Sequence, residues 1–136
     1  MDDEAFSYYL QQLRGGKEYQ AAYDVFLTES DPDDIPKLIA AFYADTSIGM
    51  QMVLLEIIWQ QYSPDTLNFL ATVLQHPNSE LWQTALDGVF FIGTPMAMTI
   101  LKTEQARLRS IHSLEAHSRL EYIDEAIQQL SEWADN

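Results

Sequence analysis

The densest group of residues that could bind a metal or transfer protons is His112, Glu115 and His117. A metal site needs His, Asp or Glu side chains that converge, and helix residues three or four apart can do so. His112 and Glu115 have that spacing, but His117 follows His112 by five residues and would point elsewhere. We interpret the two histidines as surface residues of a polar linker, and we expect no metal and no cofactor.

Carboxylate clusters are the next candidates, because two neighbouring carboxyls can act as a general acid and a general base. Asp31, Asp33 and Asp34 stand together, and Glu121 and Glu125 are four residues apart. The three aspartates coincide with an expected helix start, where the helix dipole favours each negative charge by about 0.3–1 kcal/mol. We interpret them as capping residues, and the two glutamates as part of a solvent-exposed helix face.

Nucleophilic catalysis has no visible support in the sequence. The chain has no cysteine, and no nucleophile-elbow motif surrounds a serine. Gly15-Gly16 is a lone pair of glycines, which predicts a turn rather than a phosphate-binding loop. We therefore predict that the protein is not an enzyme. The alternative, an enzyme acting on a small ligand between helices, would require a deep polar pocket with convergent titratable groups.

The charge balance narrows the class of partner. The chain has 21 acidic and 7 basic residues, for a net charge of −14. Lys37 is the only base between residues 18 and 101, and the later bases crowd into 102–119. Nucleic acids and anionic membranes require basic surfaces, so neither is expected as a partner. A basic protein would be attracted. The alternative is that the acidity serves only to keep the protein soluble.

Nothing in the sequence predicts export or membrane insertion. The opening MDDEAFSYYL is acidic where a signal peptide would be basic, and no apolar run approaches the length that spans a bilayer. The 136 residues, 47% of them hydrophobic, are enough for one folded domain over 1–136. We expect it in the cytoplasm, as a monomer when free.

A repeated helix start organises the middle of the chain. Asp31-Pro32, Ser63-Pro64 and Thr94-Pro95 begin 32 and 31 residues apart. Asp, Ser and Thr accept hydrogen bonds from unpaired backbone N–H groups at a helix start, and proline suits the first helical position. Each pair therefore predicts the first turn of a helix, and their spacing predicts a structural repeat.

The segments after these starts align with one another. Residues 35–45 match 67–77, with apolar residues at helical spacing. Short polar turns follow, and then 49–60 match 81–92, after which Gly93 provides a helix stop. Each repeat is thus predicted to be a helix, a tight turn and a second helix.

The ends of the chain follow this pattern more loosely. Helices are expected near 3–13 and over 17–29. The third repeat opens with 94–103 and then gives way to a polar stretch before a long final helix over 113–133. That helix has one apolar stripe and one broad polar face, as the terminal cap of a stacked array requires.

The segments IPKLIAAFYAD (35–45) and SELWQTALDGVFFIG (79–93) resemble the HEAT-repeat family, in its branch of short bacterial repeats. The resemblance covers roughly 31–103, and it departs from the family where an arginine early in the second helix is replaced by Met50 and Trp82. It implies an all-α fold, an α-solenoid of about four antiparallel helix pairs with a long C-terminal capping helix. It also implies a shallow groove lined by the second helices, and no chemistry.

We expect that groove to bind a protein. The segment 49–60 is apolar nearly all round, so it is either buried between neighbours, which we favour, or partly exposed for a partner. Exposed aromatic side chains would anchor a partner, and carboxylates around them would select a basic one. The expected partner-binding residues are Asp24, Gln51, Glu56, Trp59, Trp82, Gln83, Asp87 and Phe91.

The leading hypothesis is a stoichiometric protein-binding module, and most concretely an immunity protein that neutralises a basic toxin such as a nuclease or RNase. Small size, strong acidity and no visible chemistry resemble the profile of small acidic bacterial immunity proteins. A nuclease must be basic to hold nucleic acid, so an acidic groove would complement it. The alternative is a generic HEAT-repeat adaptor or assembly factor, whose neutral or apolar target would bind with little dependence on salt.

Overall fold

The computed structural model describes residues 1–61 and 63–134, and every regular element in these ranges is a helix. The predicted all-α class is therefore confirmed for this part of the chain. None of the helices in it is long and apolar enough to cross a bilayer. The helices are α1 (Asp3–Leu13), α2 (Tyr19–Glu29), α3 (Asp34–Ala44), α4 (Ile48–Trp59), α5 (Pro64–Val73), α6 (Ser79–Ile92), α7 (Pro95–Arg109) and α8 (Leu114–Ala134).

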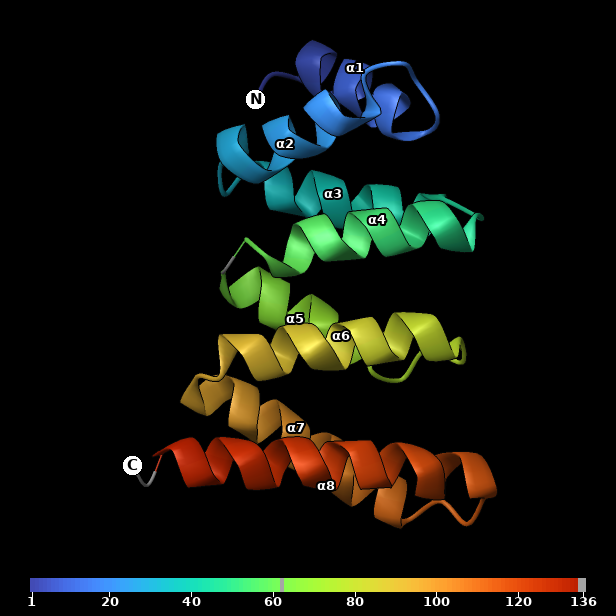
Figure 1. Ribbon diagram of the computed structural model, residues 1–136, viewed down its shortest axis with the longest axis vertical. Coiled ribbons are helices and arrows are strands. Elements are labelled where there is room, and N and C mark those ends of the chain that lie inside the picture. Colours follow the sequence, from blue (N-terminus) through green and yellow to red (C-terminus); the bar gives the residue numbers. More distant parts are fainter. Residues whose placement is uncertain (62, 135–136) are drawn as a thin grey trace.

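The helices follow one another in space in the order of the chain. Each odd-numbered helix packs on the even-numbered helix after it, and successive pairs are joined through contacts such as α3 with α5 and α4 with α6. Figure 1 shows the pairs stacked along the long axis, with α4, α6 and α8 in front of α3, α5 and α7. The even-numbered helices therefore form one layer, and the odd-numbered helices form the other.

Two of the three predicted helix starts are confirmed. Ser63 and Thr94 are N-caps whose hydroxyls accept hydrogen bonds from Thr66 N and Ala97 N, and a proline follows each of them at the first helical position. The turn at Gly15, with φ of +114°, and the helix stop at Gly93, with φ of +61°, are also confirmed. Only glycine adopts these backbone angles at little cost, which explains both positions.

The start predicted at Asp31-Pro32 is wrong. Helix α3 begins at Asp34, and its N-cap Asp33 makes no side-chain capping bond. The Asp34 side chain is buried, and its Oδ2 lies 3.4 Å from the Met1 ammonium, while Lys37 Nζ lies 3.7 Å from its Oδ1. Asp31 Oδ2 also lies 3.1 Å from that ammonium. These two carboxylates therefore join the start of the chain to α3. They also accept backbone hydrogen bonds just before the helix, Asp31 Oδ1 from Asp33 N and Asp34 Oδ2 from Asp31 N.

The polar stretch predicted after residue 103 is also wrong in part, because α7 continues to Arg109. The stretch contributes Glu104 and Leu108 to a buried stripe of α7 that also includes Leu101. Glu104 is polar but buried, and its carboxylate pairs with the Arg107 guanidinium one turn later. A buried charge with a partner on its own helix can occupy a core position, although its residue type places it in a polar stretch of the sequence.

His112 and His117 are exposed, as predicted, but only His112 lies in a linker. His112 is in the loop before α8, whereas His117 lies on α8, with its Nε2 3.4 Å from Glu121 Oε1. Helix α4 is buried on most of its circumference, including Leu54, Leu55 and Ile58. Burial of this apolar helix between its neighbours is thus confirmed for most of its length. Each fully buried leucine or isoleucine contributes about 1.5–3 kcal/mol.

Candidate partner-binding face

The predicted partner-binding residues lie on three even-numbered helices. Helix α2 carries Asp24; α4 carries Gln51, Glu56 and Trp59; and α6 carries Trp82, Gln83, Asp87 and Phe91. Asp24, Gln83, Asp87 and Phe91 are exposed, Gln51, Glu56 and Trp59 are half-buried, and Trp82 is buried. We call the surface formed by the exposed and half-buried side chains of α2, α4, α6 and α8 the even-helix face.

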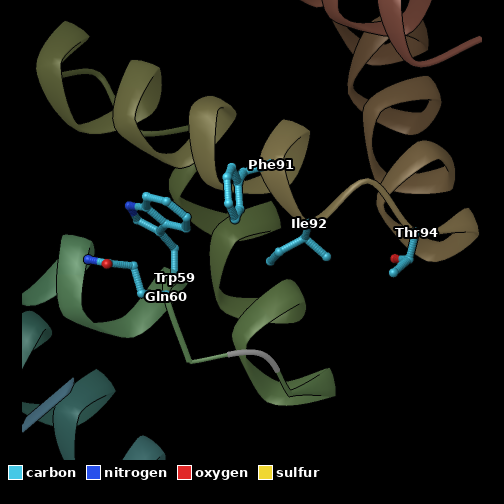
Figure 2. A pocket seen from close by; sticks show the side chains of 5 residues that line it. All are labelled: Trp59, Gln60, Phe91, Ile92 and Thr94. Carbon is cyan, nitrogen blue, oxygen red and sulfur yellow. The ribbon is translucent and has the colours of Figure 1, made fainter. Parts of the chain in front are cut away.

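Trp59 and Phe91 are in contact. Their rings meet edge to face with centroids 5.3 Å apart, and the Phe91 side chain remains 76% exposed. Figure 2 shows the two side chains pointing toward each other from α4 and α6. Together with Gln60, Ile92 and Thr94 they line a cavity of about 450 Å³. We call this cavity the Trp59–Phe91 slot.

The close approach of α4 and α6 holds Trp59 in place. A Cβ atom added at Gly88 would lie 2.8 Å from Trp59 Cβ and 2.9 Å from its Cγ, closer than side-chain atoms approach one another. Glycine within a helix costs about 1 kcal/mol relative to alanine, so the presence of glycine at position 88 requires a structural explanation. The reason is that the base of the Trp59 side chain lies directly against the α6 backbone.

Gln60 ties this slot to the neighbouring helix. Its Nε2 donates to Glu56 O at 2.8 Å and to Tyr23 Oη on α2 at 3.2 Å. Both bonds use the amide nitrogen, so the side-chain carbonyl oxygen keeps its capacity to accept a hydrogen bond. The slot therefore contains two aromatic rings and polar acceptor groups.

Carboxylates stand one turn before each ring of the slot. Glu56 precedes Trp59 by three residues and Asp87 precedes Phe91 by four, so each pair shares a side of its helix. No lysine or arginine occurs anywhere in α2, α4 or α6. Partial burial raises the pKa of the Asp87 carboxyl above its usual value. Asp87 is thus a carboxylate with reduced hydration on a surface rich in acids.

Trp82 is enclosed by α8 rather than open to a partner. The Arg119 guanidinium lies 4.9 Å from the Trp82 ring, and the Tyr122 ring meets it edge to face at 5.6 Å. Arg119 Nη2 also donates to Glu115 Oε1 at 2.6 Å and to Pro77 O at 3.2 Å. With its side chain only 5% exposed, Trp82 offers little area for a partner.

The repeat spacing accounts for part of the site, and tertiary packing accounts for the rest. Trp59 and Phe91 are 32 residues apart and touch, and so do Met52 and Thr84, whose Oγ1 lies 3.8 Å from the sulfur. Sequence reasoning missed Gln60 and Gly88. The same 32-residue offset places Gln60 opposite Ile92, which also lines the slot, so that signal was available.

Comparisons of this chain with protein-family models, with curated proteins and with solved structures found no match. Within residues 1–61 and 63–134, no group of three or more His, Asp or Glu side chains is placed to hold a metal ion. The geometry and charge of the even-helix face are therefore the basis for assigning a function.

Proposed function

We propose that the protein is a protein-binding module that uses its even-helix face to bind a basic protein. The observation that carries this proposal is the combination on one layer of exposed aromatic side chains, flanking carboxylates and three helices without lysine or arginine. Aromatic residues dominate interface energetics, and a surface of one charge sign accelerates encounter with the opposite sign.

The finer architecture that we propose is an α-solenoid of HEAT type, with antiparallel helix pairs. The repeated Ser-Pro and Thr-Pro helix starts and the contacts between successive pairs support it. In such an array the second helices of the repeats present one continuous surface, which suits recognition of another protein. The free protein is proposed to be a monomer, because a net charge of −14 would repel a second copy.

In its most concrete form, the proposal is a cytoplasmic immunity protein that neutralises a nuclease toxin. A nuclease must expose basic residues where it binds phosphates, and an acidic face that covers those residues would block its substrate. Inhibition of this kind needs one inhibitor per toxin and no catalysis. It therefore agrees with the expectation that the chain is not an enzyme.

The test combines cell protection with binding kinetics. The products of the genes that neighbour this one are searched for a basic toxin candidate, which is co-expressed with the protein, and protection is expected. Association of the purified pair is then measured from low to high salt. We expect the association rate to fall steeply with salt and to drop about tenfold or more in the Glu56→Lys/Asp87→Lys variant. Absence of protection, together with no basic toxin in pull-downs from the source organism, would defeat the proposal.

A matched charge control separates local recognition from net charge. Glu4→Lys/Asp65→Lys makes the same change in net charge, with exposed residues of α1 and α5 in the odd-numbered layer. This control should slow association much less than the Glu56→Lys/Asp87→Lys variant. Equal effects would mean that only overall charge matters, and that the even-helix face is not the binding surface.

The apolar character of the Trp59–Phe91 slot favours a second candidate function, an adaptor that binds a neutral or apolar target. The same kinetic experiment distinguishes the two functions. An association rate that salt leaves nearly unchanged would favour the adaptor, because screening acts on charge attraction and not on apolar contact.

A further inference from the structure

We propose that the Trp59–Phe91 slot receives the guanidinium group of an arginine side chain on the partner. This inference rests on the proposed function, because it specifies which chemical group of a basic partner the even-helix face recognises. Three observations carry it: a guanidinium already seated on another indole of the molecule, the unused acceptors around Trp59, and the one-sided charge of the surface.

Arg119 shows how this protein seats a guanidinium. Its group lies 4.9 Å from the Trp82 ring, while Nη2 donates to the Glu115 carboxylate and to the Pro77 carbonyl oxygen. The arrangement thus combines an aromatic face, a carboxylate and a backbone acceptor. Arginine suits such a place because its planar group can stack on a ring and donate hydrogen bonds in its own plane at the same time.

Two of these components, aromatic rings and hydrogen-bond acceptors, line the slot at Trp59, and a carboxylate lies one helical turn away, at Glu56. The ring of Phe91 extends the aromatic wall, Glu56 supplies a carboxylate one turn away, and Gln60 keeps a free amide carbonyl. The final carbonyls of a helix lack intrahelical partners, so the end of α6 at Phe91 and Ile92 adds backbone acceptors. In the described part of the chain, the cations that lie over rings are Lys37, on Phe6, and Arg119, on Trp82.

The charge of the face selects the occupant among the side chains that would fit. A leucine could contact both rings but would leave Glu56 and the acceptors without a new partner. A lysine ammonium would satisfy the charge but is compact and strongly hydrated, so it loses more water and stacks less well. A second copy of this acidic chain would bring more negative charge to the face. An arginine from a basic partner meets the aromatic, acceptor and charge requirements together.

The experiment uses the full-length protein labelled with ¹⁵N, and it follows the indole N–H signals of Trp59, Trp82 and Trp133. The probe is the peptide acetyl-Gly-Arg-Gly-amide, compared with peptides that carry lysine, leucine or citrulline, the neutral analogue of arginine. The Trp59→Phe variant assigns the Trp59 signal. Trp82, which is covered by Arg119, and the exposed Trp133 serve as internal controls.

The arginine peptide is expected to shift the Trp59 signal saturably, with a dissociation constant on the order of 1 mM. Binding should be at least about threefold weaker for lysine and undetectable for citrulline and leucine. Phe91→Leu should weaken arginine binding, and Phe91→Tyr should retain it. Equal binding of citrulline or leucine, an equal response of Trp133, or unchanged affinity in Phe91→Leu would overturn the inference.

The peptide experiment on the slot and the test of the proposed function can fail independently of each other. If a basic toxin is bound through Glu56 and Asp87 but the arginine peptide does not shift the Trp59 signal, the function stands and the slot assignment fails. If the peptide binds as expected but the toxin candidate is not neutralised, the slot assignment stands and the immunity role fails.

Discussion

The two tryptophans of the central even-numbered helices have opposite surroundings. Trp82, near the start of α6, is covered by Arg119 and Tyr122 of α8. Trp59, at the end of α4, shares its slot with Phe91, a residue that is itself largely exposed. The two indoles belong to adjacent helices of one layer, yet one is buried in the core and the other is half-buried beside an exposed ring.

The difference follows from the position of α8. This last helix packs on α6 and supplies the cation over Trp82, and its Trp133 ring lies 5.1 Å from Phe90 at the other end of α6. The junction between α4 and α6 receives no such cover over Phe91. An aromatic side chain that other parts of the same chain cover contributes to stability. An aromatic side chain that stays exposed leaves apolar surface in water, and a bound partner can bury that surface.

Truncation of the two tryptophans should separate these roles most clearly. Trp82→Ala removes a buried indole and leaves the Arg119 guanidinium without its ring, so we expect the free energy of unfolding to fall by about 3–5 kcal/mol. Trp59→Ala removes a half-buried ring, and its loss should not exceed about 2 kcal/mol. Urea unfolding of both variants measures the difference. Equal losses would mean that Trp59 is as much a core residue as Trp82.

The Gly88→Ala substitution should sharpen the comparison because, of the two tryptophans, it should disturb only Trp59. The new methyl would meet Trp59 Cβ and Cγ below 3.0 Å and Leu70 Cδ1 at 3.3 Å. We expect a net destabilisation of about 1–3 kcal/mol, although alanine favours a helix by about 1 kcal/mol. We expect the fluorescence of Trp59 to change and the fluorescence of Trp82 to stay the same.

Gly49→Ala is the matched control for this substitution. A Cβ at Gly49 meets only Ser47 Oγ, at 3.7 Å, so alanine should be accepted there and stabilise α4 slightly. If both alanine variants were stabilised alike, the proposed contact between Trp59 and the α6 backbone would be wrong.

The sequence repeat relates the two aromatic residues of the Trp59–Phe91 slot, but it does not relate Trp82 to the residues that cover it. Trp59 and Phe91 are 32 residues apart, the spacing of the sequence repeat, and their rings are in contact. Arg119 lies 37 residues after Trp82 and outside the repeat, so no periodicity connects them. The burial of Trp82 depends on where α8 packs, which is a tertiary property.

The misassigned aspartates have a similar explanation. Ser63 and Thr94 begin helices through bonds to residues three positions later, which a local pattern predicts. Asp34 is paired with the Met1 ammonium and with Lys37, and the first of these partners is 33 residues away. The Asp31 side chain does accept a local hydrogen bond, from Asp33 N, but α3 begins only at Asp34, and a local pattern gives no sign of the pairing of Asp31 and Asp34 with Met1.

Phe91→Ala should have a small effect on stability and a large one on binding. The side chain is 76% exposed, so little buried area is lost, and we expect the free energy of unfolding to change by less than about 1 kcal/mol. Affinity for the basic partner should fall at least tenfold, since an exposed aromatic anchor is removed. Thermal unfolding measures the change in stability, and calorimetry measures the change in affinity. An unchanged affinity would show that the slot lies outside the interface.

The smallest expected effect concerns Asp87, which lies on α6 between Trp82 and Phe91. Partial burial raises the pKa of its carboxyl, so the folded state holds the proton more tightly than the unfolded state. Stability from this group is therefore lost as pH rises from its usual value of 3.8 through the raised one. Asp87→Asn should stabilise the protein at pH 7 by a few tenths of a kcal/mol, because solvent screens an exposed group, and should have no benefit near pH 3.

The control is Asp24→Asn on α2, which removes the same charge from the same face. A gain in Asp87→Asn that equals that of Asp24→Asn at pH 7 would mean that relief of general repulsion, and not reduced hydration of Asp87, accounts for it.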